Sequence, residues 1–308
     1  MGSPFDPSND TGYRRWRARK LATAPTSLSE LGLTLASDAG PSAAELAQIR
    51  SCAERANMAL IRLPEGWERS GAGLRRLGAA LGLARLDQNL CADEDGISAI
   101  RVADQRRANE YIPYTDRPLS WHTDGYYNAP EQQIRAWALL CARPAAEGGE
   151  NQLLDPEIAY LLLRDENPDY VAALMRPDAM TIPPNVENGV ELRPQQSGPV
   201  FSVEKRSAAL HMRYTARTRS IEWRDDRNTR LAAGFLAELL ASDADYIIRH
   251  RLESGQGVIC NNVLHRREAF ADDAESGQQR LLYRARYHDR IAGTELLNCL
   301  SEDWKCSG

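Results

Sequence analysis

The sequence predicts a mostly β fold, a sandwich or jelly roll with helices packed against the outside. Short apolar segments of strand length recur from about residue 134 to residue 287 and are separated by turn residues. Helix signals occur at the start of the chain and as insertions between these segments. No internal repeat and no strand–helix alternation is present, which argues against a parallel βαβ sheet and favours one domain.

The elements of the first half follow from local signals. Residues 1–40 are expected to form a partly irregular N-terminal arm. Ser42 and Glu45 form a capping box, which predicts a helix from there to about Asn57. The run "MALIRL" then predicts a strand, leucines at helical spacing predict a helix over 67–83, and "ISAIRV" predicts another strand.

In the second half, "IRAWALLCA" and "NQLLD" predict buried strands. Asp155-Pro156 and Asn167-Pro168 each place an N-cap before proline, which predicts helices over 156–164 and 168–175. The Pro-, Gly- and Asn-rich stretch 183–199 reads as a long loop, either a lid or a plain surface excursion. Further strands are expected at "VFSV", "LHMRY", "YIIRHRL", "GVICNN" and "RLLYRARY", with a helix over 229–241.

Bulk composition limits the class of protein. The 308 residues include 43% hydrophobic and 26% charged residues, ordinary globular values. No apolar run approaches the roughly 20 residues that a membrane-spanning helix needs, and the N-terminus has no apolar core of a secretory signal. A net charge of -5 and a pI near 5.7 disfavour nucleic acid as a partner. We therefore expect a cytoplasmic protein without a membrane or nucleic-acid partner.

The stretch "SWHTDGYYN" contains the strongest candidate for metal binding. In an extended strand, residues two apart share a face, so His122 and Asp124 would present an imidazole and a carboxylate to one point. Of the five histidines, His265 is the best placed third ligand, because "GVICNNVLHRREAF" reads as a buried strand that leads into a turn. Two histidines and one carboxylate suit Fe(II) and leave coordination positions open.

The C-terminal strand "RLLYRARY" carries two different faces. One face holds Arg280, Leu282, Arg284 and Arg286, and the other holds Leu281, Tyr283 and Ala285. If the arginine face points inward, its guanidinium groups must be paired, and small dianions would pair them bidentately. If it points outward, the arginines are solvated, and periodicity alone leaves both orientations open.

These motifs together resemble the taurine-dioxygenase-like (TauD/TfdA-type) branch of the Fe(II)/2-oxoglutarate-dependent oxygenases. "WHTDG", "GGEN", "VLHRREAF" and "QRLLYRAR" occur in the order and approximate spacing of that family, and the resemblance extends from about Met58 to Tyr287. It implies a double-stranded β-helix (jelly-roll, cupin-like) core within one catalytic domain, residues 41–308, with helical insertions. It also implies Fe(II), 2-oxoglutarate as cosubstrate and O2.

Carried over residue by residue, the resemblance makes His122, Asp124 and His265 the metal ligands and catalytic triad. Arg280 falls where the family clamps the distal carboxylate of 2-oxoglutarate, and Arg284 falls where members contact the cosubstrate or an acidic substrate. Asn151 stands where many members have a threonine that bonds 2-oxoglutarate, and its amide can donate that bond. Arg266 stands where glycine is frequent, and we assign it no role. Since Asp124 is a carboxylate, halogenation, which needs a small residue there, is not expected.

The substrate is expected to be a small anion: an amino acid, a dicarboxylate, a sulfonate or a phosphonate. Tyr126, Tyr127 and Asn128 follow the ligands directly and are candidates to line its pocket, although the tyrosines could equally pack in the outer layer. Arg213 is a further candidate if it points inward. Family members commonly form dimers or tetramers, so a homo-oligomer is possible on the same grounds.

Three functional hypotheses follow. The first is a 2-oxoglutarate-dependent hydroxylase of a small acidic metabolite, which releases succinate and CO2; desaturation or cyclisation would start from the same intermediate. The second keeps the iron but takes electrons from the substrate and not from 2-oxoglutarate. The third, of another class, is a metal-free protein that uses the arginines to bind an anion.

Overall fold

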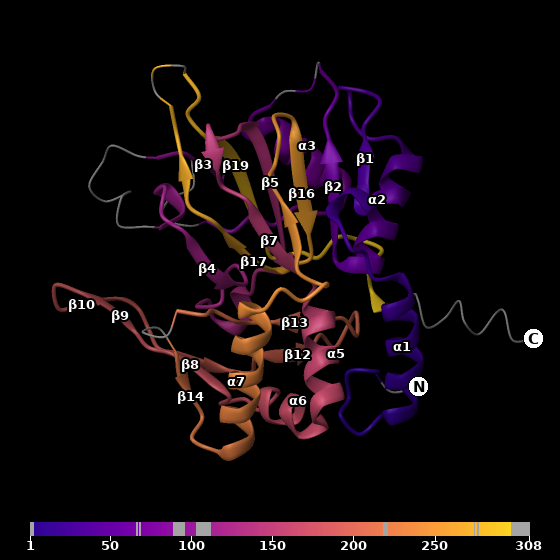
Figure 1. Ribbon diagram of the computed structural model, residues 1–308, viewed down its shortest axis with the longest axis vertical. Coiled ribbons are helices and arrows are strands. Elements are labelled where there is room, and N and C mark those ends of the chain that lie inside the picture. The colour runs from indigo at the N-terminus through magenta and orange to yellow at the C-terminus, as the bar shows by residue number, and fades with distance from the viewer. Residues whose placement is uncertain are drawn as a thin grey trace, which may run out of the picture.

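The strands of this chain pair into two principal sheets that face each other, with helices outside them (Figure 1). The computed structural model describes residues 3–65, 67, 69–88, 96–102, 112–217, 221–273, 275 and 277–296. Among these residues, six α-helices accompany the strands. The expected sheets with helices packed outside are present, and the helical share is larger than the strand pattern predicted.

The larger sheet has six strands, most of them antiparallel to their neighbours. In spatial order they are β1 (Gly32–Thr34), β2 (Met58–Arg62), β16 (Gln256–Cys260), β5 (Ala136–Arg143), β19 (Leu281–Tyr287) and β3 (Ile97–Ile100). The central strand β5 shows why the sheet is buried on both faces. Ala138 and Leu140 pack in the cluster under the helices, whereas Trp137 and Cys141 pack in the cluster that faces the second sheet.

The smaller sheet has four strands and supplies the opposite wall. Its spatial order is β15 (Ile248–His250), β7 (Asn151–Leu154), β17 (Leu264–Arg267) and β4 (Leu119–His122). Leu153 on β7 and Val258 on β16 belong to the same buried cluster, so side chains of the two sheets meet in one interior layer.

Helices α2 (Ala43–Ala56) and α3 (Gly71–Ala80) cover the outer face of the large sheet (Figure 1). The predicted capping box is confirmed, since the side chains of Ser42 and Glu45 each bind the other's backbone N–H. Asn57 ends α2 in the left-handed conformation, with φ of 57°. The helix expected over 67–83 is shorter than predicted, because Ser70 caps it immediately before Gly71.

The lower half of the molecule in Figure 1 is a separate apolar cluster built mainly from helices and short strands. Its helices are α1 (Asp10–Thr23), α5 (Pro156–Glu166), α6 (Pro168–Leu174) and α7 (Arg227–Ala241). Its strands are β8 (Met180–Ile182), β11 (Gln196–Gly198), β14 (Glu222–Trp223), β12 (Phe201–Val203) and β13 (Leu210–Met212). Asp155 and Asn167 cap α5 and α6 before proline, as predicted.

The remaining elements are short. They are η1 (Leu28–Leu31), η2 (Ile112–Tyr114), η3 (Pro130–Gln132), β6 (Glu147–Gly148) and β18 (Phe270–Ala271). The first forty residues, expected as a partly irregular arm, contribute α1, η1 and β1, and they bury Phe5 and Trp16 in the lower cluster. The predicted end of the catalytic domain, 297–308, lies outside the described residues.

The stretch 183–199 differs from the loop that the sequence suggested. It forms a hairpin of β9 (Asn185–Glu187) and β10 (Val190–Arg193), followed by β11. Asn188 and Gly189 occupy the turn with φ of 51° and 80°, the positive values that a two-residue hairpin turn requires. The Asn-Gly pair was thus the signal for a hairpin, and the surrounding prolines obscured it.

None of the helices within the described residues is long and apolar enough to cross a membrane. The cytoplasmic location and the homo-oligomer stay predictions.

A buried charge cluster fastens α1 to α5. Lys20 lies 2.6 Å from Asp155 and 2.6 Å from Glu157, and all three side chains are buried. Asn57 extends the cluster, because its amide donates to Asp155 at 2.9 Å. Burial works against the charge of Lys20, but the two carboxylates hold its pKa above the usual value.

We expect Lys20→Met to lower the free energy of unfolding by about 3 kcal/mol, because it leaves buried carboxylates without their cation. Urea denaturation followed by circular dichroism measures this loss. The matched control is Arg15→Met on the same helix, where the side chain is exposed, and it should change stability by less than about 0.5 kcal/mol. Equal effects of the two substitutions would contradict the role of Lys20.

Candidate metal centre

The register between β4 and β17 brings the two candidate histidine ligands together. His265 lies directly opposite His122 in this antiparallel pair, and their ring centroids are 4.2 Å apart. The neighbours Trp121 and Arg266 point to the other face, where the Arg266 guanidinium lies 5.7 Å from the Trp121 ring. The strand period therefore sends both imidazoles toward the interior.

Backbone carbonyls orient both imidazoles. Nδ1 of His122 lies 2.8 Å from the carbonyl oxygen of Ser120, and Nδ1 of His265 lies 3.0 Å from that of Val263. Because a carbonyl can only accept, each Nδ1 carries the hydrogen and each Nε2 keeps its lone pair. Burial, together with the adjacent His122, lowers the pKa of His265 to about 3. Neutral imidazoles with free Nε2 atoms are the form that binds metals.

Asp124 completes the cluster from the turn after β4. The side chain of Asn262 accepts from the Asp124 N–H at 2.8 Å and donates to the Asp124 carbonyl at 3.0 Å, which fixes the turn. Burial alone would raise the pKa of Asp124, but the positive charges of Arg284 and Arg286 hold it well below its usual range. The carboxylate is thus ionised although it is buried.

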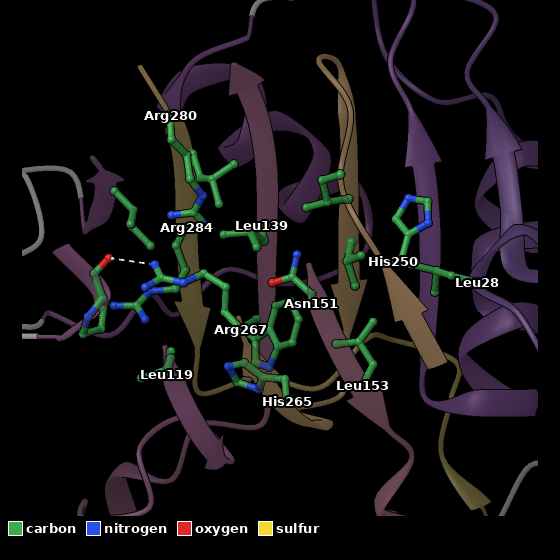
Figure 2. Close-up of a pocket in the computed structure, with 16 residues that line it drawn as sticks. Leu28, Leu119, Leu139, Asn151, Leu153, His250, His265, Arg267, Arg280 and Arg284 are labelled. Atoms are coloured by element: carbon green, nitrogen blue, oxygen red, sulfur yellow. Dashed lines mark hydrogen bonds between the residues drawn. The ribbon is translucent and has the colours of Figure 1, made fainter. Parts of the chain in front are cut away.

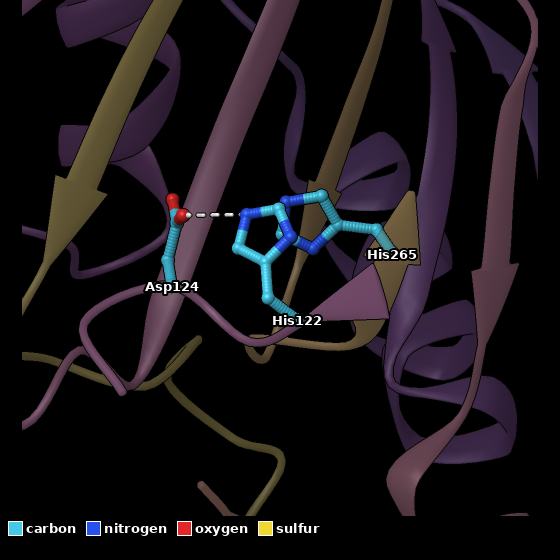
Figure 3. A group of neighbouring side chains, drawn as sticks. All are labelled: His122, Asp124 and His265. Atoms are coloured by element: carbon cyan, nitrogen blue, oxygen red, sulfur yellow. Dashed lines mark ion pairs between the residues drawn. The ribbon is translucent and has the colours of Figure 1, made fainter. Parts of the chain in front are cut away.

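The three side chains fit a divalent metal. One ligand atom from each lies within 4.8 Å of the others, and Oδ1 of Asp124 is 3.6 Å from Nε2 of His122 (Figure 3). Oδ2 of Asp124 is buried and has no hydrogen-bond partner, so it is an acceptor that a cation would satisfy. Two nitrogens and a carboxylate suit Fe(II) and leave positions for other ligands.

The arginine face of β19 points inward. Arg280 and Arg284 line a cavity of about 50 Å³ between the two sheets, together with His265, Trp137 and Asn151 (Figure 2). The opposite face is also buried, because Ala285 and Tyr287 pack under α3. The question that periodicity left open is answered by the second sheet, which covers the arginines.

The buried polar atoms of this cavity without partners are mostly donors. They include Nη1 of Arg280, Nε of Arg284 and Nε1 of Trp137. No carboxylate among the described residues pairs with Arg280, and burial lowers its pKa to about 9. A cavity with unused donors and two guanidinium groups fits a ligand rich in acceptors, such as a dicarboxylate.

Asn151 and Arg267 have different surroundings within this cavity. Asn151 opens β7 and its amide lies beside the cavity, where the resemblance places a hydrogen-bonding side chain (Figure 2). Arg267 donates to the carbonyl oxygens of Thr115 at 2.9 Å and of Arg117. Arg267 therefore anchors the segment before β4, whereas Arg280 keeps donors for a ligand.

The tyrosines after Asp124 lie beside the metal cluster. The Tyr126 ring is 6.4 Å from the His122 ring and 5.1 Å from the Tyr127 ring. The Tyr127 hydroxyl accepts a hydrogen bond from Arg286 at 3.1 Å. Both rings are half-buried and pack at the edge of the lower cluster. The tyrosines thus combine packing with a position beside the candidate metal ligands, the two possibilities that the sequence left open. Asn128 is in the turn, and its amide donates to Gln132 at 2.8 Å.

Arg213 does not line the cavity. Its guanidinium donates to five backbone carbonyls, those of Tyr126, Met180, Gln196, Gly198 and Pro199. Burial lowers its pKa to about 10. The side chain clasps the loop after Asp124 to β8 and β11, so its surroundings give it a structural role and not the contact with substrate that we expected.

Sequence reasoning missed three side chains near the centre. Trp137 packs on His265 with ring centroids 4.7 Å apart. Asp87 pairs with Arg286 beneath Tyr127. Arg193, at the end of β10, places its guanidinium 5.8 Å from the centroid of the Tyr127 ring. Of these three, only Trp137 could have been predicted, because the alternation of side chains along β5 places it on the inward face of that strand.

Comparison with known proteins places these features in a family. The sequence profile of the taurine catabolism dioxygenase TauD, TfdA family matches residues 19–286. A curated relative, a uridine-5'-phosphate dioxygenase from Amycolatopsis sp., is 31% identical over 177 residues. That match covers 54% of this chain and 60% of the relative.

Solved structures share the fold at low identity. The non-heme iron oxygenase OrfP, in complex with Fe, succinate and (3S)-hydroxy-L-Arg, has a TM-score of 0.56 at 18% identity, covering 88% of this chain and 89% of that one. Asparagine oxygenase, with Fe(II), a hydroxyasparagine and succinate, has a TM-score of 0.54 at 16% identity, covering 88% and 91%.

We expect Arg280→Gln to weaken 2-oxoglutarate binding by about 100-fold, because it removes the buried cation to which the family resemblance assigns the distal carboxylate. The visible charge-transfer band of the Fe(II)–2-oxoglutarate chelate, titrated anaerobically, measures the affinity. Arg249→Gln, an exposed arginine of β15 paired only with Asp243, is the control and should leave the titration unchanged. Unaltered affinity in Arg280→Gln would reject the clamp.

Proposed function

Because the chain belongs to the taurine catabolism dioxygenase TauD, TfdA family, we propose that it hydroxylates an unactivated C–H bond of a small anionic metabolite. As a member of this family it is an Fe(II)/2-oxoglutarate-dependent dioxygenase that uses Fe(II), 2-oxoglutarate and O2. The metal-free binding protein is thereby rejected, and so is an oxygenase that takes its electrons from the substrate. The observation that carries the proposal is a buried His-Asp-His cluster beside a cavity with unused guanidinium donors.

In this proposal His122, Asp124 and His265 hold the iron through Nε2, a carboxylate oxygen and Nε2. When bound, the iron supplies O2 activation coupled to conversion of 2-oxoglutarate into succinate and CO2. Arg280 binds the distal carboxylate of 2-oxoglutarate, and Asn151 donates a hydrogen bond to it. The apolar wall formed by Trp137, Leu139 and Leu282 keeps water away from the cosubstrate.

Arg284 has a separate task. Its Nη1 lies 3.9 Å from Oδ1 of Asp124, and its Nε is buried without a partner, so its charge acts at the metal. We propose that Arg284 interacts with the ionised carboxylate of Asp124 on one side and with an anionic group of the cosubstrate or the substrate on the other. A guanidinium suits both assignments, because it carries a permanent charge and several donors.

The two principal sheets support the finer fold assignment as well. Residues of both sheets line one cavity, and β4 and β17 carry the metal ligands at its edge. We propose that these sheets are the two halves of a double-stranded β-helix, with α2, α3 and the lower helical cluster as insertions around it.

Two observations support an anionic substrate. The guanidinium of Arg284 lies 3.9 Å from the candidate ligand Asp124 and keeps a buried donor without a partner, and the curated relative is named for a nucleotide. That relative favours adding a phosphate ester to the amino acids, dicarboxylates, sulfonates and phosphonates predicted from the sequence. Desaturation or cyclisation would use the same site and differ only in the product.

We expect one anion of a panel to raise succinate formation above the uncoupled rate by at least about tenfold. The panel is uridine 5'-phosphate, taurine, malate, 2-aminoethylphosphonate and asparagine, each assayed with Fe(II), 2-oxoglutarate and O2. Mass spectrometry identifies the reaction, since hydroxylation adds one oxygen atom whereas desaturation removes two hydrogens. His122→Ala should abolish both succinate and the chelate band, and an intact band in that variant would contradict the ligand assignment.

A further inference from the structure

We propose that Arg193 determines substrate specificity by binding an anionic group of the substrate remote from the carbon that reacts. This inference rests on the proposed function, because it concerns the substrate of the same site. Arg193 ends β10, at the base of the hairpin that the sequence had suggested to be a loop.

The position of Arg193 connects the hairpin to the metal cluster. Its guanidinium lies over the Tyr127 ring, Tyr127 contacts Tyr126, and Tyr126 contacts the ring of His122. The clasp made by Arg213 fixes this arrangement, because it binds the carbonyls of both Tyr126 and Gln196. Arg193 is therefore held a few side chains away from the ligands and on the side of the tyrosines.

The guanidinium of Arg193 is not neutralised by the protein. It donates to the carbonyls of Pro183 at 2.6 Å and Pro194 at 2.9 Å, and no carboxylate of the described residues forms an ion pair with it. Burial lowers the pKa of Arg193. Its two hydrogen bonds use one donor of each terminal nitrogen, whereas Arg213 uses its whole guanidinium on carbonyls, so Arg193 keeps donors and a charge for an anion.

Counting formal charges at the loaded site leads to the same conclusion. Iron(II) is balanced by the Asp124 carboxylate together with one negative charge of 2-oxoglutarate, and the other charge of 2-oxoglutarate is balanced by Arg280. Asp87 balances Arg286. Arg213 and Arg267 also lack a carboxylate partner, but they use most of their donors on backbone carbonyls. Arg193 and Arg284 then stay without a counter-charge and with donors to offer. The geometry points to a substrate with two negative charges or two anionic groups, as in a phosphate monoester or a dicarboxylate.

The experiment compares wild-type protein with Arg193→Gln, both loaded anaerobically with Fe(II) and 2-oxoglutarate. Calorimetric titration with uridine 5'-phosphate, taurine and malate measures the dissociation constant of each probe. We expect Arg193→Gln to bind the tightest of these probes at least about tenfold more weakly, because a hydrogen-bonded charge is lost. Arg193→Lys should recover part of this affinity, since it retains the charge but not the planar fork.

Arg227→Gln is the matched control, because Arg227 is an exposed arginine at the start of α7 and forms no ion pair with the described residues. It should bind every probe as the wild type does. Binding by Arg193→Gln within twofold of the wild type would overturn the inference. A wild type that forms the chelate band but binds none of the probes would overturn it as well. Failure of the proposed function is distinct, because the wild type would then form no chelate band.

Discussion

The site depends on the register between β4 and β17. With His265 opposite His122, both imidazoles enter the space between the sheets, and Asp124 follows from the turn after β4. A slip of one residue in either strand would turn the imidazole of that strand outward, because side chains alternate along a strand. The pairing of Asn262 with the backbone of Asp124 reinforces this register from the end of β16.

The second constraint is the burial of both faces of β19. One face packs under α3 through Ala285 and Tyr287, and the other turns Arg280 and Arg284 into a cavity with apolar walls. Buried guanidinium groups cost stability unless an anion accompanies them. Arg286 has that anion in Asp87, whereas Arg280 has none among the described residues. The unbalanced charge marks the place where a ligand contributes to the stability of the folded protein.

Arg213 and Arg286 hold the tyrosines after Asp124 in place through contacts with other parts of the protein. Arg213 uses its whole guanidinium on backbone carbonyls and so joins the tyrosine loop to β8 and β11. Arg286 holds the Tyr127 hydroxyl from below. A rigid frame of this kind lets an exposed hairpin carry a residue such as Arg193 to a defined place beside Tyr127.

The sequence by itself indicated the local elements and the three side chains of the candidate metal cluster. The capping box at Ser42, the proline-capped helices and the spacing of His122 and Asp124 follow from short-range rules that any fold must obey. Only the tertiary structure decided which face of β19 points inward, because both faces carry residues that can be buried. It also separated Arg280, which keeps free donors, from Arg213, whose donors are all used by carbonyls. The reason is that the role of an arginine depends on the groups to which its guanidinium donates, and these groups come from segments far apart in the sequence.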